Sequence, residues 1–258
     1  MLQHEDVIAE IMDGPDGPEI GAFFDFDGTL ISGYSAIAFL QEQVKRGNLS
    51  PRELLELVSV MVSFGLGQKG FSAMMLAASQ FLRGIHEDTY ERFGEELFES
   101  HIARQIYPES RALVQAHLKK GHTVAIVTSA TRYQVEPAAR DLGIEHVLFT
   151  RLEVEKGYFT GAVVHPTCFG QGKVTAAEAL ATEHGVDLEK SYFYSDSDDD
   201  IELLERVGKP RPLNPNSSLQ RIAERKGWPV RRFGSRDKTN ISYWIRSLFM
   251  PADLVGSV

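Results

Sequence analysis

The chain alternates between helical and strand-like patterns from residue 107 onward, and this alternation restricts the fold more than any other feature. Helical patterns cover 108–120, 131–142, 171–184, 199–207 and 216–226, and strand-like runs lie at 123–127, 146–150, 191–195, near 210 and at 229–232. An earlier apolar run at 20–24, bounded by turn residues, predicts a buried first strand. Together these patterns predict an α/β fold, a doubly wound parallel sheet with helices on both faces. A hairpin is predicted over 152–164.

Residues 33–106 have helical periodicity without a convincing strand. Ser50, Pro51 and Glu53 predict a helix start, because serine can cap, proline suits the first turn and glutamate can reach back to the cap amide. We therefore expect a helical cap inserted into the α/β core. The expected division is 1–32 with 107–258 for the core and 33–106 for the cap.

The N-terminal residues 1–19 look like a mobile lead-in, because Gly14, Pro15, Gly17 and Pro18 interrupt any helix there. They lack the apolar core and basic flank of a signal peptide. The apolar stretch 54–82 is too interrupted for a membrane span. One cysteine, Cys168, excludes an internal disulfide and favours a reducing, cytoplasmic compartment.

The net charge of −9 argues against a general nucleic-acid-binding protein. Basic residues gather toward the C-terminus, where a solvated face is the favoured interpretation. Residues 241–250 are expected to pack on their own domain, and peripheral contact with a membrane or a partner is the alternative. The sequence does not fix the oligomeric state.

Acidic and hydroxyl side chains follow the predicted strands, and in parallel sheets active sites lie at the carboxyl ends of strands. These side chains are Asp25 and Asp27, then Thr128 and Ser129, then Asp196, Asp199 and Asp200. Carboxylates gathered in one site require a cation, and Mg²⁺ prefers oxygen ligands. Lys173, near the start of a predicted helix, and a hydroxyl would stabilise a phosphoryl group in transfer. One carboxylate can attack phosphorus and a second can exchange protons, so the pattern predicts a phosphatase.

Four segments, in this order, resemble the haloacid dehalogenase-like (HAD) phosphohydrolase superfamily. They are Asp25-Phe26-Asp27-Gly28-Thr29, the strand ending at Thr128, Lys173, and the run 195–200. The resemblance covers about residues 20–233. The helical insert is similar to the C1-type cap of the phosphoserine-phosphatase-like branch, subfamily IB, and so are 192–197, 213–216 and 227–229.

The resemblance implies a role for each matching position. Asp25 would be the nucleophile, and Asp27 the general acid and base that also lends its backbone carbonyl to the metal. Phosphate would be held by Thr128, Ser129 and Lys173, and Mg²⁺ by Asp25, Asp27 and Asp196, with Asp200 and Asp199 behind the metal site or as additional partners.

The substrate is less constrained by the sequence. Phosphoserine phosphatases carry a glutamate at the position of Tyr34, which meets the ammonium group, so Tyr34 argues against phosphoserine. The apolar cap stretch 58–82 is expected to be helix-packing core, and the alternative is a wall suited to a lipid-like phosphomonoester. The resulting expectation is a small or lipid-like phosphomonoester. Phosphoserine phosphatase proper, a dehalogenase and a catalytically weak binding or regulatory module remain as alternatives.

Overall fold

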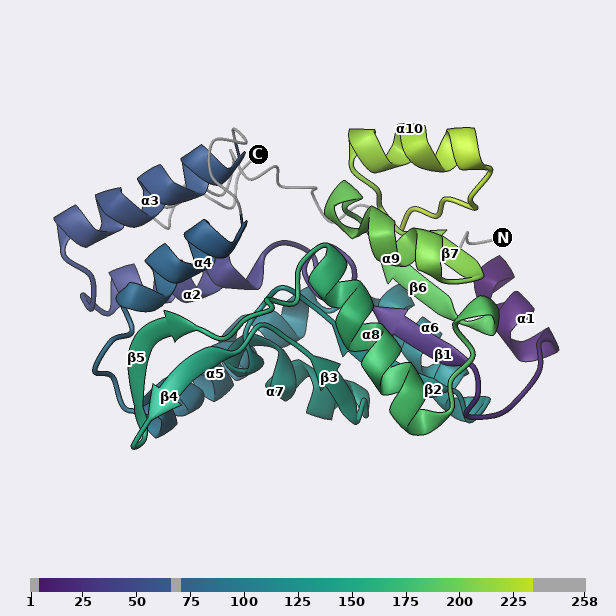
Figure 1. The fold of residues 1–258 in the computed structure, drawn as a ribbon, viewed down its shortest axis with the longest axis horizontal. Helices are drawn as coiled ribbons and strands as arrows, with labels where there is room; N and C mark the ends of the chain where they lie inside the picture. The colour runs from purple at the N-terminus through teal and green to yellow at the C-terminus, as the bar shows by residue number, and fades with distance from the viewer. Residues whose placement is uncertain (1–4, 66–70, 234–258) are drawn as a thin grey trace.

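The computed structural model describes residues 5–65 and 71–233, and its centre is a five-stranded parallel sheet with the order β3-β2-β1-β6-β7 (Figure 1). The strands are β1 (Gly21–Phe24), β2 (Thr123–Val127), β3 (His146–Leu148), β6 (Tyr192–Ser195) and β7 (Lys209–Pro212). In the register, Ala22 of β1 lies opposite Val124 of β2 on one side and Tyr192 of β6 on the other. The predicted α/β fold is confirmed.

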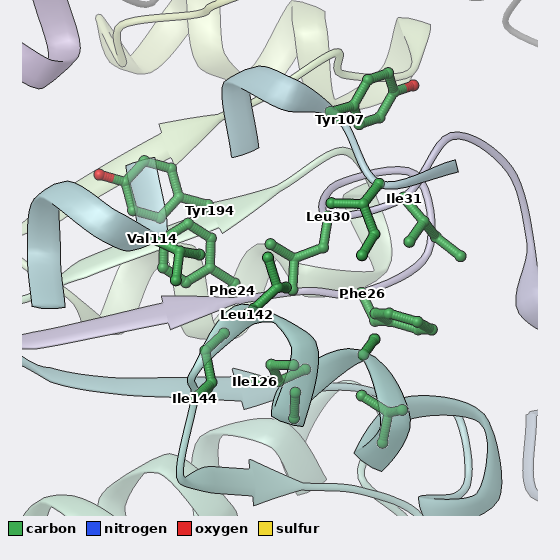
Figure 2. Packing of buried hydrophobic residues seen from close by; sticks show 14 of the residues in the cluster. Phe24, Phe26, Leu30, Ile31, Tyr107, Val114, Ile126, Leu142, Ile144 and Tyr194 are labelled. Carbon is green, nitrogen blue, oxygen red and sulfur yellow. The ribbon is translucent and has the colours of Figure 1, made fainter. Parts of the chain in front are cut away.

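Helices cover both faces of the sheet. They are α1 (Glu5–Asp13), α6 (Pro108–Lys119) and α7 (Arg132–Leu142) on one face, and α8 (Gln171–His184), α9 (Ile201–Arg206) and α10 (Ser217–Lys226) on the other. Side chains alternate between two apolar clusters, as a strand's period of two requires. Phe24 and Tyr194 stack in the first cluster with ring centroids 4.5 Å apart (Figure 2), whereas Phe23 and Phe193 belong to the second.

The helical insert follows β1. It contains α2 (Ser35–Lys45), α3 (Pro51–Gly65), α4 (Phe71–Gln80), α5 (Glu87–Ser100) and a 3₁₀ turn (Ile102–Gln105). The predicted capping arrangement at the start of α3 is present, because the Ser50 amide donates to Glu53 Oε2 at 2.7 Å and the Glu53 amide to Ser50 Oγ at 3.3 Å. In the described ranges no helix is both long and apolar enough to cross a bilayer.

The predicted hairpin is present as β4 (Leu152–Glu155) and β5 (Tyr158–Val163), and it lies beside α4 and α5 (Figure 1). Ser79 Oγ donates to the Gly161 carbonyl at 2.7 Å, and the Gly84 amide donates to the Phe159 carbonyl at 2.9 Å. The hairpin therefore extends the helical insert, although its sequence lies within the segment assigned to the core. The division at residue 107 stays a prediction.

The prediction that residues 1–19 contain no helix is wrong for the part of this segment that the structure describes. Residues Glu5–Asp13 form α1, and Val7 and Ile11 are buried in the first apolar cluster beside α6. Gly14 ends the helix, so the turn residues mark its boundary and do not prevent it from forming. The amphipathic pattern before Gly14 decides the structure, because burial of one face compensates for a short helix.

The strand expected at 229–232 is also absent from the described part of the chain. Pro229 has no amide hydrogen to donate to a ladder. Only a bridge forms, between Leu213 and Arg231, in which the Arg231 amide donates to the Pro212 carbonyl at 3.0 Å. The loop at 66–70 and the segment 241–250 lie outside the described residues.

A buried chain of hydrogen bonds links α6 to the N-terminal turn. His122 Nε2 lies 3.0 Å from the Pro15 carbonyl, the two Nδ1 atoms of His122 and His117 are 2.8 Å apart, and His117 Nε2 lies 2.8 Å from the Tyr194 hydroxyl. Burial lowers the pKa of His122 as well as that of His117, so both imidazoles are taken as neutral. Because a carbonyl only accepts, neutral His122 then donates to Pro15, His117 donates to His122, and Tyr194 donates to His117. Burial lowers the pKa of His117 well below its usual value, and the neighbouring His122 lowers it further.

This network predicts loss of stability in mild acid. Below about pH 6.5 an unfolded histidine binds a proton that folded His117 does not, so the free energy of unfolding should fall by up to about 1.4 kcal/mol per pH unit. Above about pH 7.5 the effect should vanish, because both states are neutral. Urea unfolding across this range tests the prediction. The His117→Gln variant should show a smaller slope than wild type, while exposed His101→Gln should not; equal slopes for wild type and His117→Gln would contradict it.

Candidate active site

Asp25 lies at the carboxyl end of the central strand. Its amide donates to the Tyr194 carbonyl at 2.9 Å, so the ends of β1 and β6 lie side by side, and β2 flanks β1 on the other edge. Parallel pairing brings the residues that follow these strands, among them Thr128 and Asp196, to the same edge of the sheet. The side chain of Asp25 is nearly inaccessible at that edge, as the residue is 7% exposed.

Lys173 joins two of these acidic residues. Its Nζ lies 2.8 Å from Asp25 Oδ1 and 2.7 Å from Asp200 Oδ1, and Ser195 Oγ donates to Asp200 Oδ2 at 2.7 Å. Lys173 sits in the first turn of α8, where a Cβ on Gly172 would lie 1.9 Å from the Thr167 carbonyl oxygen. Glycine at 172 therefore permits the close approach that delivers the lysine to the strand ends.

Charge and burial act against each other in this cluster. Burial raises the pKa of Asp25, the positive charge of Lys173 opposes this, and the charges of Asp200 and Asp27 raise it again. Burial alone would lower the pKa of Lys173, but Asp200 and Asp25 outweigh it and raise the pKa above its usual value. Lys173 is thus an ammonium ion that compensates two buried carboxyl groups.

Asp27 faces the first helix of the insert. The Ser35 amide donates to Asp27 Oδ1 at 2.7 Å and Ser35 Oγ donates to Oδ2 at 3.1 Å, so the carboxylate lies at the N-terminus of α2. Gln134, at the start of α7, donates from Nε2 to Ser35 Oγ at 3.0 Å. Burial raises the pKa of Asp27 to about 6, although both Ser35 bonds lower it. A carboxyl with this pKa can exchange a proton near neutral pH.

Ser35 and Gln134 were not singled out from the sequence. Ser35 stands in the first turn of a helix, where serine is common, and Gln134 belongs to the capping box of α7 with Thr131. Both residues therefore have ordinary local explanations, and only the fold shows that they support Asp27.

The two hydroxyl residues predicted to hold phosphate follow β2. Thr128 is 1% exposed, and its Oγ1 accepts a hydrogen bond from the Ala130 amide at 3.1 Å, which leaves the hydroxyl proton for another acceptor. Ser129, next in the chain, is half-buried in the same turn. Both stand at the sheet edge that carries Asp25.

Asp196 lies against the loop that follows β1. A Cβ on Gly28 would lie 2.3 Å from Asp196 Oδ2, so this carboxylate occupies the space that any other side chain at 28 would fill. The pKa of the Tyr34 phenol is raised by its partial burial and then by Asp196, Asp27 and Asp25, which places it beside the acidic cluster. Asp199 is exposed, and its carboxylate accepts a hydrogen bond from Ser197 Oγ at 3.3 Å. The ion pairs of Lys173 are with Asp25 and Asp200.

The donor set at this edge suits a hard cation. Within residues 5–65 and 71–233, no three acidic, histidine or cysteine side chains form a ready-made metal cage. Asp25 is turned to Lys173 and Asp27 to Ser35. Mg²⁺ needs only one or two carboxylates and otherwise takes carbonyl oxygens, water and phosphate. The carboxylates of Asp25 and Asp196 and the backbone carbonyl of Asp27 are oxygen donors of the kind that this ion takes.

A family model described as haloacid dehalogenase-like hydrolase matches residues 22–205. The chain belongs to this HAD family. It is 34% identical to a putative hydrolase of Mycobacterium leprae over 84% of this chain and 74% of that protein. It is 35% identical to the phosphoserine phosphatase SerB1 of Mycobacterium tuberculosis, over 82% and 70%. It is 30% identical to a histidinol-phosphatase of Neisseria meningitidis, over 82% and 98%.

Solved structures share the fold. A Bordetella pertussis protein of unknown function aligns with a TM-score of 0.77 and 28% identity, over 83% of this chain and 98% of that one. A substrate-bound phosphoserine phosphatase aligns with a TM-score of 0.62 at 18% identity, over 91% and 98%, which shows the fold alone. The predictions of a HAD hydrolase and of a phosphatase are confirmed.

Proposed function

We propose that this HAD phosphatase is a magnesium-dependent hydrolase of small or lipid-like phosphomonoesters that passes through an aspartyl phosphate on Asp25. The observation that carries the proposal is the buried contact of Lys173 with Asp25 and Asp200 at the strand ends. A charged lysine beside a carboxylate neutralises the charge that develops on a phosphoryl group in transfer.

The reaction proceeds in two steps. An oxygen of Asp25 attacks phosphorus, the bond from phosphorus to the substrate oxygen breaks, and the carboxyl of Asp27 gives its proton to the leaving alcohol. Water then attacks the aspartyl phosphate, Asp27 accepts the proton of the water, and the bond between phosphorus and Asp25 breaks to release phosphate. Lys173 and the hydroxyls of Thr128 and Ser129 hold the phosphoryl oxygens.

Asp25, Asp196 and the Asp27 carbonyl would hold Mg²⁺, which supplies positive charge to the phosphoryl oxygens when it is bound. Asp200 keeps Lys173 in place, since it contacts the ammonium group and is itself held by Ser195. Asp199 adds negative charge near the site.

Removal of the metal is a direct test of this proposal. Hydrolysis of p-nitrophenyl phosphate should disappear in excess EDTA and return when Mg²⁺ is added back, because Lys173 alone cannot balance the charge of Asp25, Asp196 and a phosphate dianion. Full activity in EDTA, with metal content verified, would contradict magnesium dependence.

Phosphates of amino alcohols are the second candidate substrates. The similarity to a phosphoserine phosphatase and a histidinol-phosphatase favours them. Tyr34 argues against phosphoserine, because a phenol supplies no charge for an ammonium group. A panel with phosphoserine, histidinol phosphate and alkyl phosphates compares the candidates by kcat/KM. Absence of turnover across the panel would favour a binding or regulatory module.

The Ser35 contacts predict an effect that depends on the leaving group. Ser35→Ala removes the hydroxyl that orients Asp27, whereas the backbone amide at 35 still donates to it. For an alkyl phosphate, kcat/KM, which covers only the steps up to the aspartyl phosphate, should therefore fall about tenfold, part of the roughly 10²- to 10⁴-fold that a general acid contributes. For p-nitrophenyl phosphate kcat/KM should fall much less, because its leaving group needs little protonation. Ser100→Ala, at the end of α5, is the control. Equal losses on both substrates would assign Ser35 a structural role only.

A further inference from the structure

The helical insert contains a cavity of about 510 Å³ that the reaction described above does not use. Its wall comes mainly from α2, α3, α4 and α5, with contributions from α7 and β4. It is largely apolar, with Phe39, Leu40, Leu57, Met74, Met75 and Leu82 among its lining residues. Protein interiors are normally packed to the density of organic crystals. A cavity of this size falls in the range of small-molecule sites, so a ligand is the natural occupant.

Within residues 5–65 and 71–233, some lining side chains keep apolar surface that their neighbours leave accessible. Leu57, Met74 and Met75 are only partly buried, whereas Phe23 and Phe24 of the sheet core are fully buried. Burial of such surface is favourable in proportion to its area, so an apolar ligand would gain affinity here. Methionine side chains also adapt to irregular apolar shapes.

The inner end of the cavity approaches the reacting groups. Gln134 lines the cavity and donates to Ser35 Oγ at 3.0 Å, and Ser35 Oγ donates to Asp27 Oδ2 at 3.1 Å. Ala36, also in the wall, follows Ser35 directly. The cavity is therefore two hydrogen bonds from the carboxyl that would protonate the leaving alcohol. The group attached to that alcohol oxygen would extend toward the cavity.

Two of the three charged residues at the wall, Arg46 and Glu96, form an ion pair. Arg46 lies 3.0 Å from Glu96 and 2.9 Å from Glu42, and Arg92 Nε donates to the Asp88 carbonyl at 3.2 Å. A second charged group on the ligand would have to compete with these contacts. This arrangement favours an uncharged occupant.

We infer that the cavity binds the apolar tail of the substrate, and that preferred substrates are monophosphates of single-chain amphiphilic alcohols. The inference rests on the proposed function for the position of the phosphate at Asp25. The helical cap would select substrates by their apolar tail, and the length of that tail would decide specificity.

Chain length gives the first test. For ethyl, butyl, hexyl and octyl phosphate, each below its micelle concentration, kcat/KM should rise by about two- to fourfold per methylene until the cavity is filled, as expected for burial of each methylene. A flat or falling series would overturn the inference.

Two tryptophan variants on the same helix give the matched comparison. Ala78 lines the cavity, so Ala78→Trp should fill it and flatten the octyl-to-ethyl ratio of kcat/KM. Leu76 is 46% exposed, so Leu76→Trp should keep the wild-type ratio. Circular dichroism verifies folding, and Val60→Trp, which fills the cavity from α3, replaces Ala78→Trp if that variant does not fold. An unchanged ratio in the folded cavity variant would overturn the inference.

Octylphosphonate, which cannot be hydrolysed, separates failure of this inference from failure of the proposed function. A flat chain-length series together with Asp25-dependent hydrolysis of p-nitrophenyl phosphate overturns the tail site and leaves the proposed function intact. Absence of all hydrolysis, together with calorimetric binding of octylphosphonate that Ala78→Trp weakens, supports an apolar site but overturns the proposed function and the tail's role in a substrate.

Discussion

Replacement of Asp25 by Asn is expected to reduce turnover of p-nitrophenyl phosphate by roughly 10⁴- to 10⁶-fold, the range seen when a covalent nucleophile is removed. An amide oxygen is a poor nucleophile, so the aspartyl phosphate would not form. The substitution preserves side-chain volume, and Lys173 keeps Asp200 as a partner. The loss should therefore appear in kcat and not as unfolding.

The control for this variant is an aspartate of similar chemistry outside the site. Asp187→Asn, in a partly exposed turn, should leave kcat unchanged. Intact-mass measurement verifies that the Asp25→Asn protein has not deamidated, and circular dichroism verifies its fold. Turnover within about tenfold of wild type by this folded, verified variant would eliminate Asp25 as the nucleophile.

Replacement of Lys173 by Met should impair both activity and stability. Loss of a group that stabilises transition-state charge typically costs about 10²- to 10³-fold in kcat. Lys173 is 3% exposed and balances Asp25 and Asp200, so its removal leaves two buried carboxyl groups without a cation. Breaking such a buried pair costs about 3–5 kcal/mol, and the free energy of unfolding at neutral pH without metal should fall by about that amount.

A second substitution distinguishes these two effects of Lys173. Lys173→Met combined with Asp200→Asn removes one uncompensated charge, so part of the stability should return while activity stays low. Lys190→Met, at an exposed lysine, is the matched control and should change neither property measurably. Wild-type stability and activity in Lys173→Met would contradict the proposed role of the buried ion pair.

The sheet was predictable because its signals are local. Strands β1, β2 and β6 are short runs rich in apolar or aromatic residues, and each active-site residue of the core follows such a run or starts the next helix. Parallel pairing then converts separate sequence positions into one edge, which is why Asp25, Lys173 and Asp200 could be expected to meet. The contacts of Lys173 with both carboxyl groups are consistent with that expectation.

The remaining features depend on packing between distant segments. The helix Glu5–Asp13 is stabilised by burial of Val7 and Ile11 beside α6, about a hundred residues later in the chain. The turn residues at 14–18 give no sign of this packing. Pro229 was an available local signal against the strand expected at 229–232. The contact of Gln134 with Ser35 forms only when α7 packs beside α2. The cap cavity likewise forms only when α2, α3, α4 and α5 come together.

The most direct measurement is rapid acid quenching of the enzyme during turnover, followed by peptide mapping. The account predicts that the peptide containing Asp25 gains the mass of one phosphoryl group, that hydroxylamine removes it, and that Asp25→Asn does not acquire it. Hydrolysis that proceeds while no phosphoryl group, or one on another residue, is trapped under the same conditions would contradict the account.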